Sequence, residues 1–252
     1  MKRKLTAVLA CRNNGSRLYA KPLQYLDNNK KVNVLKMIID TLKKEKIINE
    51  IILSISSNKD NFIYRDIAIK EKLNFVLGSD KDVLKRLILG ANKSNATDVF
   101  RITTESPFVS FHKIKELWNL HCNNNYDLTI YDNNIDGMGF EIFKLNALKL
   151  SHKNGLSKHR SELCDLYIRE NFKKFNIRLI EEKKIRFKTR LTIDNPEDLI
   201  YCRNLYQKLV RFYPRFPIEK IILYLKNDKK NYQLIKKFIP KSKSISNLWS
   251  KK

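Results

Sequence analysis

The stretch LTAVLACRNNGSRLYAKPL, residues 5–23, decides the fold because an apolar run passes directly into a turn rich in cations. Residues 5–10 form the apolar run and show no helical periodicity, which is typical of a strand buried on both faces of a parallel sheet. The turn contains Asn-Asn-Gly-Ser, and Arg12, Arg17 and Lys21 surround it. Ligands of α/β proteins bind at the carboxyl ends of such strands, so this turn is the first candidate for a binding site.

Short apolar runs alternate with amphipathic segments over most of the chain. The patterns predict further strands at 50–56, 74–79, 98–103, 127–132, 139–144, 177–182 and 190–194. They predict helices at 34–42, 83–92, 111–124 and 158–171, and one more after Asn195. Ser157 is the expected N-cap of the 158–171 helix, and Asn195 followed by Pro196 favours a helix start. The alternation predicts an α/β fold, a single three-layer α/β/α domain with a mostly parallel sheet, over residues 1–212.

The pattern changes near residue 211, where Pro214 and Pro217 interrupt it. Residues 213–240 are predicted to form a short, basic C-terminal extension with two helices. Residues 241–252 are expected to be a disordered basic tail, because they hold too few apolar residues to build a core.

Net charge, cysteine spacing and hydropathy indicate which partners and which cellular setting to expect. The 252 residues carry a formal charge of +25, which favours anionic partners such as nucleotides, nucleic acid or an anionic membrane surface. A general bias toward Lys, Asn and Ile is the alternative source of this surplus. The four cysteines are scattered without zinc spacing, which predicts a reduced, cytoplasmic setting. No run of about 18 apolar residues is present to span a membrane.

The basic turn has the chemistry of a phosphate site. A turn that contains Gly15 lets backbone N–H groups approach an anion. Arg17 offers a planar fork for two phosphate oxygens, and Lys21 a mobile point charge. The turn matches neither the Walker loop nor the Rossmann glycine motif. The alternative is an ordinary loop whose cations are simply solvated.

Polar residues also follow other predicted strands. Ser79 and Asp80 follow the third strand, Glu105 the fourth and Asp194 the last. Because parallel strands end at one edge of a sheet, these residues are expected to converge with Arg12 on one crevice.

These residues lie in motifs that resemble a known family. The opening stretch resembles the signature A-R-x-x-S-x-R-L-x-x-K-x-L of the sugar-nucleotide cytidylyltransferases, related to the acylneuraminate enzymes, in the branch of spore coat polysaccharide biosynthesis protein F. Four further stretches agree in order: GSDKDVLKR (78–86), RITTESPFVS (101–110), GMGFEIF (137–143) and RLTIDNPEDL (190–199). The resemblance covers about residues 1–238 and implies the nucleotidyltransferase, or nucleotide-diphospho-sugar transferase-like, version of the α/β fold.

The resemblance implies a reaction and a set of site residues. An acceptor oxygen attacks the α-phosphate of CTP, pyrophosphate leaves, and a CMP-linked sugar or sugar acid forms for surface polysaccharide biosynthesis. Arg17 and Lys21 are expected to be catalytic, through the charge on the departing pyrophosphate. Glu105 and Asp194 are expected to bind Mg²⁺. The nucleotide-binding residues are expected to be Ala10, Arg12, Asn13, Gly15, Ser16, Asp82 and Arg101. The substrate-binding residues are expected to be Glu141, His159 and Arg160.

Two residues depart from the family pattern. Glu105 stands where the family generally has Asp, which moves the carboxylate outward by about 1.5 Å. Gly139 stands where the family often has another Asp. Purely structural alternatives also exist for single residues. Asp82 and Arg86 are spaced for a helical salt bridge, against contact with the nucleotide or a loop that holds it, and His159 for packing. Glu105 also suits a turn before Pro107, Asp194 a position just before a helix cap, and His121 a place in the core.

Two other functions compete with this one. A nucleotide-sugar-dependent glycosyltransferase shares the architecture, but the spacing of Asp132 and Asp136 does not match its D-x-D pair. A non-catalytic relative that binds anions or membranes is the other alternative. No RNA-binding fingerprint is present, so we expect no specific nucleic acid, and at most weak electrostatic membrane contact through the basic C-terminal region. The resemblance also implies a homodimer.

Overall fold

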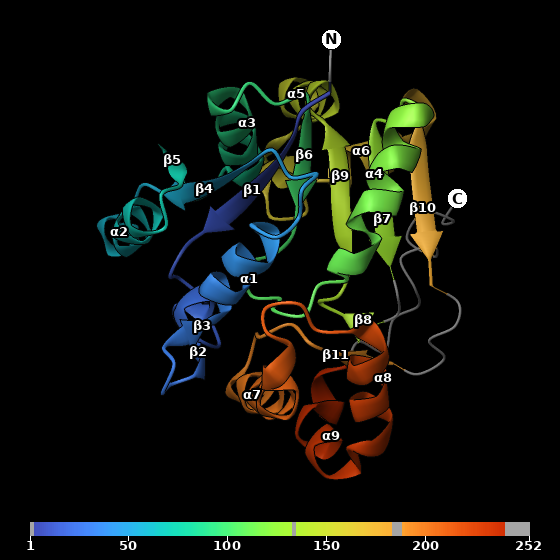
Figure 1. Ribbon diagram of the computed structural model, residues 1–252. Coiled ribbons are helices and arrows are strands. Elements are labelled where there is room, and N and C mark those ends of the chain that lie inside the picture. Colours follow the sequence, from blue (N-terminus) through green and yellow to red (C-terminus); the bar gives the residue numbers. More distant parts are fainter. Residues whose placement is uncertain (1–2, 133–134, 183–187, 240–252) are drawn as a thin grey trace.

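The first strand, β1 (Leu5–Cys11), lies inside a seven-stranded sheet, and all of its side chains except Ala10 are buried. The computed structural model describes residues 3–132, 135–182 and 188–239 (Figure 1). The strand order is β10-β7-β9-β6-β1-β4-β5. The other strands of this sheet are β4 (Glu50–Ser56), β5 (Asn74–Gly78), β6 (Asp98–Arg101), β7 (Leu128–Asp132), β9 (Phe140–Lys144) and β10 (Ile177–Glu181).

The sheet is mostly parallel, as predicted. β1 pairs in parallel with β4 and β6, β4 with β5, and β10 with β7. β9 runs antiparallel to both of its neighbours, β6 and β7. The parallel strands β1, β4 and β6 therefore end at the same edge of the sheet, where their polar continuations meet.

Helices cover both faces of the sheet, which gives three layers (Figure 1). Leu5, Ala7 and Leu9 point into one core with α1 (Val34–Leu42), α2 (Ile63–Lys70) and α4 (Ile114–Asn123). Val8 points into a second core with α3 (Val83–Lys93), α5 (Leu145–Asn154) and α6 (Leu166–Glu170). The alternation follows from the two-residue period of a strand, and it explains why β1 is apolar on both sides.

Local sequence signals account for several helix starts. Asn33 caps α1 by accepting a hydrogen bond from the Lys36 N–H at 2.7 Å, and Asp82 caps α3 in the same way through the Lys85 N–H at 2.8 Å. Before α1, a short 3₁₀ turn (Lys21–Leu23) leads into a small hairpin of β2 (Tyr25–Asp27) and β3 (Val32–Asn33). This hairpin keeps the basic turn next to α1.

The C-terminal helices gather at the carboxyl end of the sheet (Figure 1). These are α7 (Pro196–Leu209), α8 (Ile218–Asn227) and α9 (Lys229–Ile235). Ile221, Leu225 and Ile235 are buried in the same core as α1 and α7. The predicted pair of helices in the C-terminal extension is therefore present, whereas the predicted tail at 241–252 lies outside the described residues. Among the described helices, none combines the length and apolarity that crossing a membrane requires.

Two predicted elements differ from the structure. The strand expected at 190–194 is limited to β11 (Thr189–Arg190), because its partner β8 (Ile135–Asp136) is equally short and pairs with it outside the main sheet. The chain then packs closely on Gly137, whose φ of +90° and proximity to the Thr192 backbone leave no room for a Cβ. α5 was not anticipated.

The helix expected at 158–171 is interrupted. A 3₁₀ turn covers Ser157–Arg160, with Leu156 rather than Ser157 at its N-cap, and α6 begins only at Leu166. His159 explains the interruption, because its Nδ1 accepts from the Leu156 N–H at 2.7 Å while Nε2 contacts Glu170 at 2.8 Å. These bonds stabilise the turn in place of a continuing helix.

The start of α7 is held by a buried carboxylate. Asp198 is 1% exposed, and its Oδ2 accepts from the backbone N–H groups of Asn195 at 2.9 Å and Asp194 at 3.0 Å. Its Oδ1 lies 3.1 Å from Nε of the buried Arg190. Asp198 thereby fixes the backbone that carries Asp194.

We predict that Asp198→Ala lowers the free energy of unfolding by about 3–5 kcal/mol, because it leaves Arg190 buried without this partner and removes the cap. Urea denaturation measures the loss. Glu197→Ala is the matched control, since Glu197 is the adjacent helix carboxylate and pairs at the surface with Lys237. Equal losses in the two variants would contradict the role of Asp198.

Candidate active site

A pocket of about 360 Å³ opens at the carboxyl ends of β1 and β6. The basic turn, the first part of α3 and the segment after β6 form most of its wall, and Glu162, Leu163 and Asp194 complete it. The predicted site residues that line it are Ala10, Arg12, Asn13, Gly15, Ser16, Arg17, Lys21, Arg101, Glu105 and Asp194. The predicted convergence therefore occurs for these residues, although Asp194 does not follow a strand of the main sheet, since β11 ends at Arg190 and pairs with β8 outside that sheet.

Other predicted residues lie elsewhere. Glu141 is buried and does not line the pocket, but it forms an ion pair with Arg101, which does. Asp82 faces away toward His152, whose Nε2 lies 2.9 Å from its carboxylate. His159 and Arg160 belong to the 3₁₀ turn, and Arg160 lies 3.9 Å from Asp82. Ser79 and Asp80 are also outside the pocket lining.

The basic turn is held in shape by backbone contacts. Asn13 donates its backbone N–H to Oδ1 of Asn61 at 2.6 Å and accepts from the Ala20 N–H at 2.8 Å. A Cβ at Gly15 would collide with the carbonyl oxygen of Leu18, so glycine is required there by close approach. The turn is thus anchored at both ends while Ser16 and Arg17 remain exposed.

Lys21 connects the two acids expected to bind a metal. Its Nζ donates to Oδ1 of Asp194 at 2.6 Å and lies 3.9 Å from Oε1 of Glu105. Asp194 also contacts Arg17 at 3.3 Å and Arg190 at 2.6 Å. Residues as far apart in the sequence as Arg17 and Asp194 therefore form one charged cluster.

The two acids have opposite electrostatic environments. Burial favours the neutral form of Asp194, but the hydrogen bond from Lys21 and the charges of Lys21, Arg190 and Arg17 outweigh it, so its pKa lies below the usual value. Burial raises the pKa of Glu105, and the nearby Asp194 adds to the rise, while Lys21 opposes it. Lys21 thus compensates the negative charge of Asp194 much better than it compensates the charge of Glu105.

The donor set fits a small, hard cation. Within the described ranges, no cluster of three or more His, Cys, Asp or Glu side chains is placed to hold a metal. Glu105 and Asp194 nevertheless border one pocket beside the basic turn. Mg²⁺ is commonly held by one or two carboxylates together with substrate phosphates, so two acids are sufficient here.

A second charged group closes the opposite side of the pocket. Nη1 of Arg101 lies 3.0 Å from Oε2 of Glu141, and its Nη2 donates to the carbonyl of Glu162 at 2.8 Å. The Glu162 carboxylate in turn lies 3.0 Å from Nη2 of Arg12. Burial raises the pKa of Glu141, whereas the Arg101 charge opposes the rise. Glu141 orients Arg101, and Glu162 joins the 157–165 segment to the basic turn.

The sequence left two roles open for Arg86, a helical salt bridge with Asp82 or contact with the nucleotide or a loop that holds it. Arg86 lines the pocket although it is only 1% exposed, and its Nη1 donates to the carbonyl of Cys11 at 3.4 Å. Its buried Nε has no hydrogen-bond partner in the part of the chain that the structure describes, and burial lowers the pKa of Arg86. The salt bridge considered with Asp82 is not formed among the described residues. The available signal was the spacing of Val83, Arg86, Leu87 and Gly90, which places this arginine on the inner face of its helix.

His121 has the core role that its spacing indicated. It is fully buried, stacks on Trp118 and lies between Thr129 at 2.8 Å and Asp98 at 3.2 Å. This group lies at the other end of β6 from the pocket.

The pocket is chemically suited to a polyphosphate. Five cations line it, namely Arg12, Arg17, Lys21, Arg86 and Arg101, against the three acids Glu105, Glu162 and Asp194. Arginine forks and a mobile lysine bind phosphate oxygens, and they can stabilise negative charge that grows on a leaving group.

Comparison with known proteins agrees with this chemistry. A family model described as Cytidylyltransferase matches residues 6–232. An uncharacterized protein of Methanocaldococcus jannaschii is 28% identical over 197 residues, which cover 77% of this chain and 80% of that protein. The spore coat polysaccharide biosynthesis protein SpsF of Bacillus subtilis is 25% identical over 206 residues, which cover 80% and 85%. The resemblance read from the motifs is confirmed.

The fold is shared with solved structures. A cytidylyltransferase from Leptospira borgpetersenii superposes with a TM-score of 0.79 at 21% identity. The match covers 92% of this chain and 98% of that one. This agreement confirms the nucleotidyltransferase-like α/β fold.

We predict that Glu105→Gln stabilises the protein at about pH 7 more than at about pH 4. Because the pKa of Glu105 is raised in the folded state, the native protein holds more protons than the unfolded chain between the two pKa values. The free energy of unfolding therefore falls as the pH rises through this interval. Glutamine does not titrate, so the free energy of unfolding of the variant lacks this decrease. Urea denaturation at both pH values measures the difference.

Glu116→Gln serves as the control for this measurement, because Glu116 is an exposed carboxylate on α4. If Glu105→Gln raises the free energy of unfolding equally at both pH values, the charge of Glu105 does not destabilise the folded state.

Proposed function

Because this chain belongs to the cytidylyltransferase family, we propose that it transfers CMP from CTP to a hydroxyl of a sugar or sugar acid and releases pyrophosphate. The observation that carries the proposal is the convergence of Arg17, Lys21, Glu105 and Asp194 on one pocket from three distant parts of the chain. The similarity to the spore coat polysaccharide protein supports a role in the synthesis of a surface polysaccharide.

In this proposal the basic turn binds the triphosphate. The backbone N–H groups around Gly15 and the side chains of Arg12, Ser16 and Arg17 surround the phosphates. Lys21 exchanges part of its contact with Asp194 for the phosphate oxygens, since its Nζ is already within 2.6 Å of that carboxylate. As the bond to pyrophosphate breaks, Arg17 and Lys21 stabilise the charge that accumulates on the leaving oxygen.

Glu105 and Asp194 are the residues that would hold Mg²⁺, which neutralises phosphate charge when it is bound. The longer side chain of Glu105 suits this role because Lys21 already occupies the space nearest Asp194. The same two acids keep Lys21 extended into the pocket before the nucleotide arrives.

Different lining residues are candidates for contact with the cytidine and with the acceptor. Ala10, Val83 and Leu87 offer apolar surface for a base, and the buried Arg86 beside them has N–H groups to donate. Arg101, oriented by Glu141, faces the acceptor side together with Glu162. We assign His159 and Arg160 to positioning the 157–165 segment, because both are engaged by neighbouring carboxylates. Asp82 caps α3 and so places Arg86.

A homodimer, a cytoplasmic location and weak membrane contact of the basic C-terminal helices stay predictions.

The proposed reaction is tested by incubating the protein with CTP, Mg²⁺ and a panel of sugars and sugar acids while pyrophosphate is measured. We expect release that depends on one class of acceptor. Arg17→Met and Lys21→Met are each expected to reduce kcat/KM by about 10²–10³-fold, because each removes a charge from the leaving group. Lys30→Met, an exposed lysine outside the pocket, is the control. No CTP binding, or full activity in both variants, would contradict the proposal.

A second prediction concerns Arg86. Arg86→Lys keeps the charge but loses the guanidinium fork, so we expect CTP to bind about ten- to a hundredfold more weakly. Isothermal titration calorimetry measures the Kd. Lys85→Arg, at the adjacent exposed position of α3, is the matched control and should leave the Kd unchanged. If both variants bind CTP as the parent does, Arg86 is structural and does not contact the nucleotide.

A further inference from the structure

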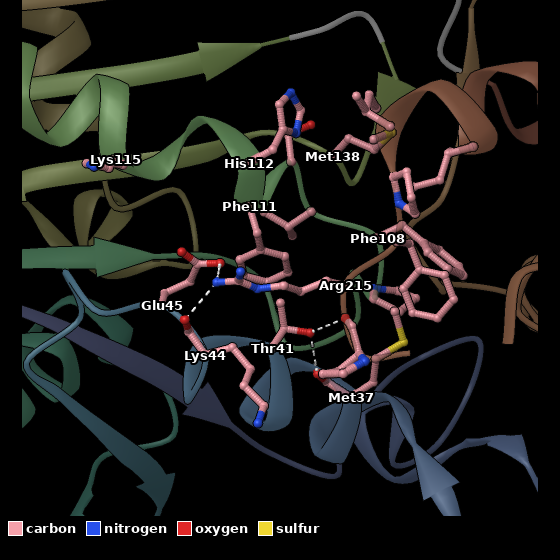
Figure 2. A pocket seen from close by; sticks show the side chains of 18 of the residues that line it. Met37, Thr41, Lys44, Glu45, Phe108, Phe111, His112, Lys115, Met138 and Arg215 are labelled. Atoms are coloured by element: carbon pink, nitrogen blue, oxygen red, sulfur yellow. Dashed lines mark hydrogen bonds and ion pairs between the residues drawn. The ribbon is translucent and has the colours of Figure 1, made fainter. Parts of the chain in front are cut away.

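A second and larger pocket, of about 650 Å³, lies between α1, the segment after Glu105 and the start of α8. It shares no lining residue with the active-site pocket among the described residues. Figure 2 shows that its labelled residues come from α1 and the chain just after it, from residues 108–115, from the segment that carries Met138 and from the chain just before α8. Nothing in the proposed transfer of CMP uses it.

The inner part of this pocket is apolar. Met37, Phe108, Phe111, Met138 and Phe216 line it, and the rings of Phe108 and Phe216 pack edge to face with centroids 5.4 Å apart. A lining of this kind excludes water and favours a hydrocarbon or aromatic group. It is a poor environment for a hydroxylated sugar, whose polar groups would lose their hydrogen bonds to water.

The mouth of the pocket carries an excess of positive charge. Lys44, Lys46 and Lys115 are exposed there, and none of the three has an ion-pair partner within the described part of the chain. Glu45 is engaged by Nη2 of Arg215 at 2.7 Å, as the dashed line in Figure 2 shows. Glu219 is the other acid of the lining, so the three lysines and Arg215 still outnumber the two acids.

We propose that this pocket binds a small amphiphile with an apolar tail and one anionic head group. The tail fits the methionine and phenylalanine lining, and the head group lies at the lysine mouth. A neutral amphiphile would fill the pocket without compensating these charges, and an inorganic anion would leave the apolar lining empty. Only a molecule that combines both parts matches both features.

Calorimetry with three probes tests the proposal on the full chain. Decyl phosphate, below its micelle concentration, is expected to bind one molecule per chain. Decyl maltoside carries the same tail without charge, and inorganic phosphate carries the charge without a tail. Both are expected to bind at least about tenfold more weakly than decyl phosphate. Equal affinity for decyl maltoside would overturn the anionic part of the proposal, and equal affinity for inorganic phosphate would overturn the apolar part.

Two variants locate the binding. The triple substitution Lys44→Glu, Lys46→Glu and Lys115→Glu reverses the charge of the mouth and is expected to weaken decyl phosphate binding at least about tenfold. Ile218→Trp places a larger side chain at a half-buried lining position and is expected to weaken it similarly. Cooperative thermal unfolding checks that both variants are folded.

A matched control has the same change of charge on other exposed lysines, Lys70→Glu, Lys153→Glu and Lys173→Glu. If this control weakens binding as much as the mouth variant, the interaction is a general effect of charge and the proposal is wrong. Unchanged binding in both the mouth variant and Ile218→Trp would likewise overturn it. Both variants are also tested for CTP binding, which uses the other pocket. Retained CTP binding with unchanged decyl phosphate binding would overturn this proposal alone and leave the proposed transferase activity standing.

Discussion

The contact between Lys21 and Asp194 is the interaction on which the site depends. Its two partners are 173 positions apart, and the 2.6 Å contact joins the turn after the first strand to the segment before α7. The connection continues inward, because Arg190 pairs with both Asp194 and the buried Asp198 and donates to the carbonyl of Phe238. One chain of charges therefore ties the basic turn, the base of α7 and the C-terminal extension together. A buried network of this kind specifies one arrangement more than it adds stability.

Carboxylates beside the pocket explain how it tolerates so many cations. Arg12 is partnered by Glu162, Arg101 by Glu141, and Lys21 by Asp194. Each cation is thus held in place by a neighbouring carboxylate and kept from folding back onto the surface. Arg86 differs, since burial holds it in position together with a long hydrogen bond to the Cys11 carbonyl. An anion that enters the pocket meets donors that are already oriented, which reduces the entropy lost on binding.

Sequence patterns predicted the scaffold and most of the pocket. The strand at 50–56 has the predicted bounds, because an apolar run between polar residues leaves little choice. Convergence of Arg12 and Glu105 followed from the strand-end rule, whereas Asp194 reaches the pocket although β11 ends at Arg190 and lies outside the main sheet. Long-range contacts could not be predicted: β11 is short because β8 is short, and His159 breaks a helix through a contact with Glu170. The burial of Arg86 and the closure by Glu162 likewise depend on segments that meet only in the folded chain.

The segment from Ile102 to Ser110 belongs to both pockets, and this has an evolutionary consequence. It carries Glu105 into the first pocket and Phe108 into the second, and the Glu105 carbonyl accepts from Ile193 while the Ser110 N–H donates to Met138. Only Ser106 and Pro107 separate Glu105 from Phe108. A substitution that shifts the backbone at Phe108 acts on the same short segment that positions Glu105. Changes that reshape one cavity through this segment therefore bear on the other as well, which couples the divergence of the two.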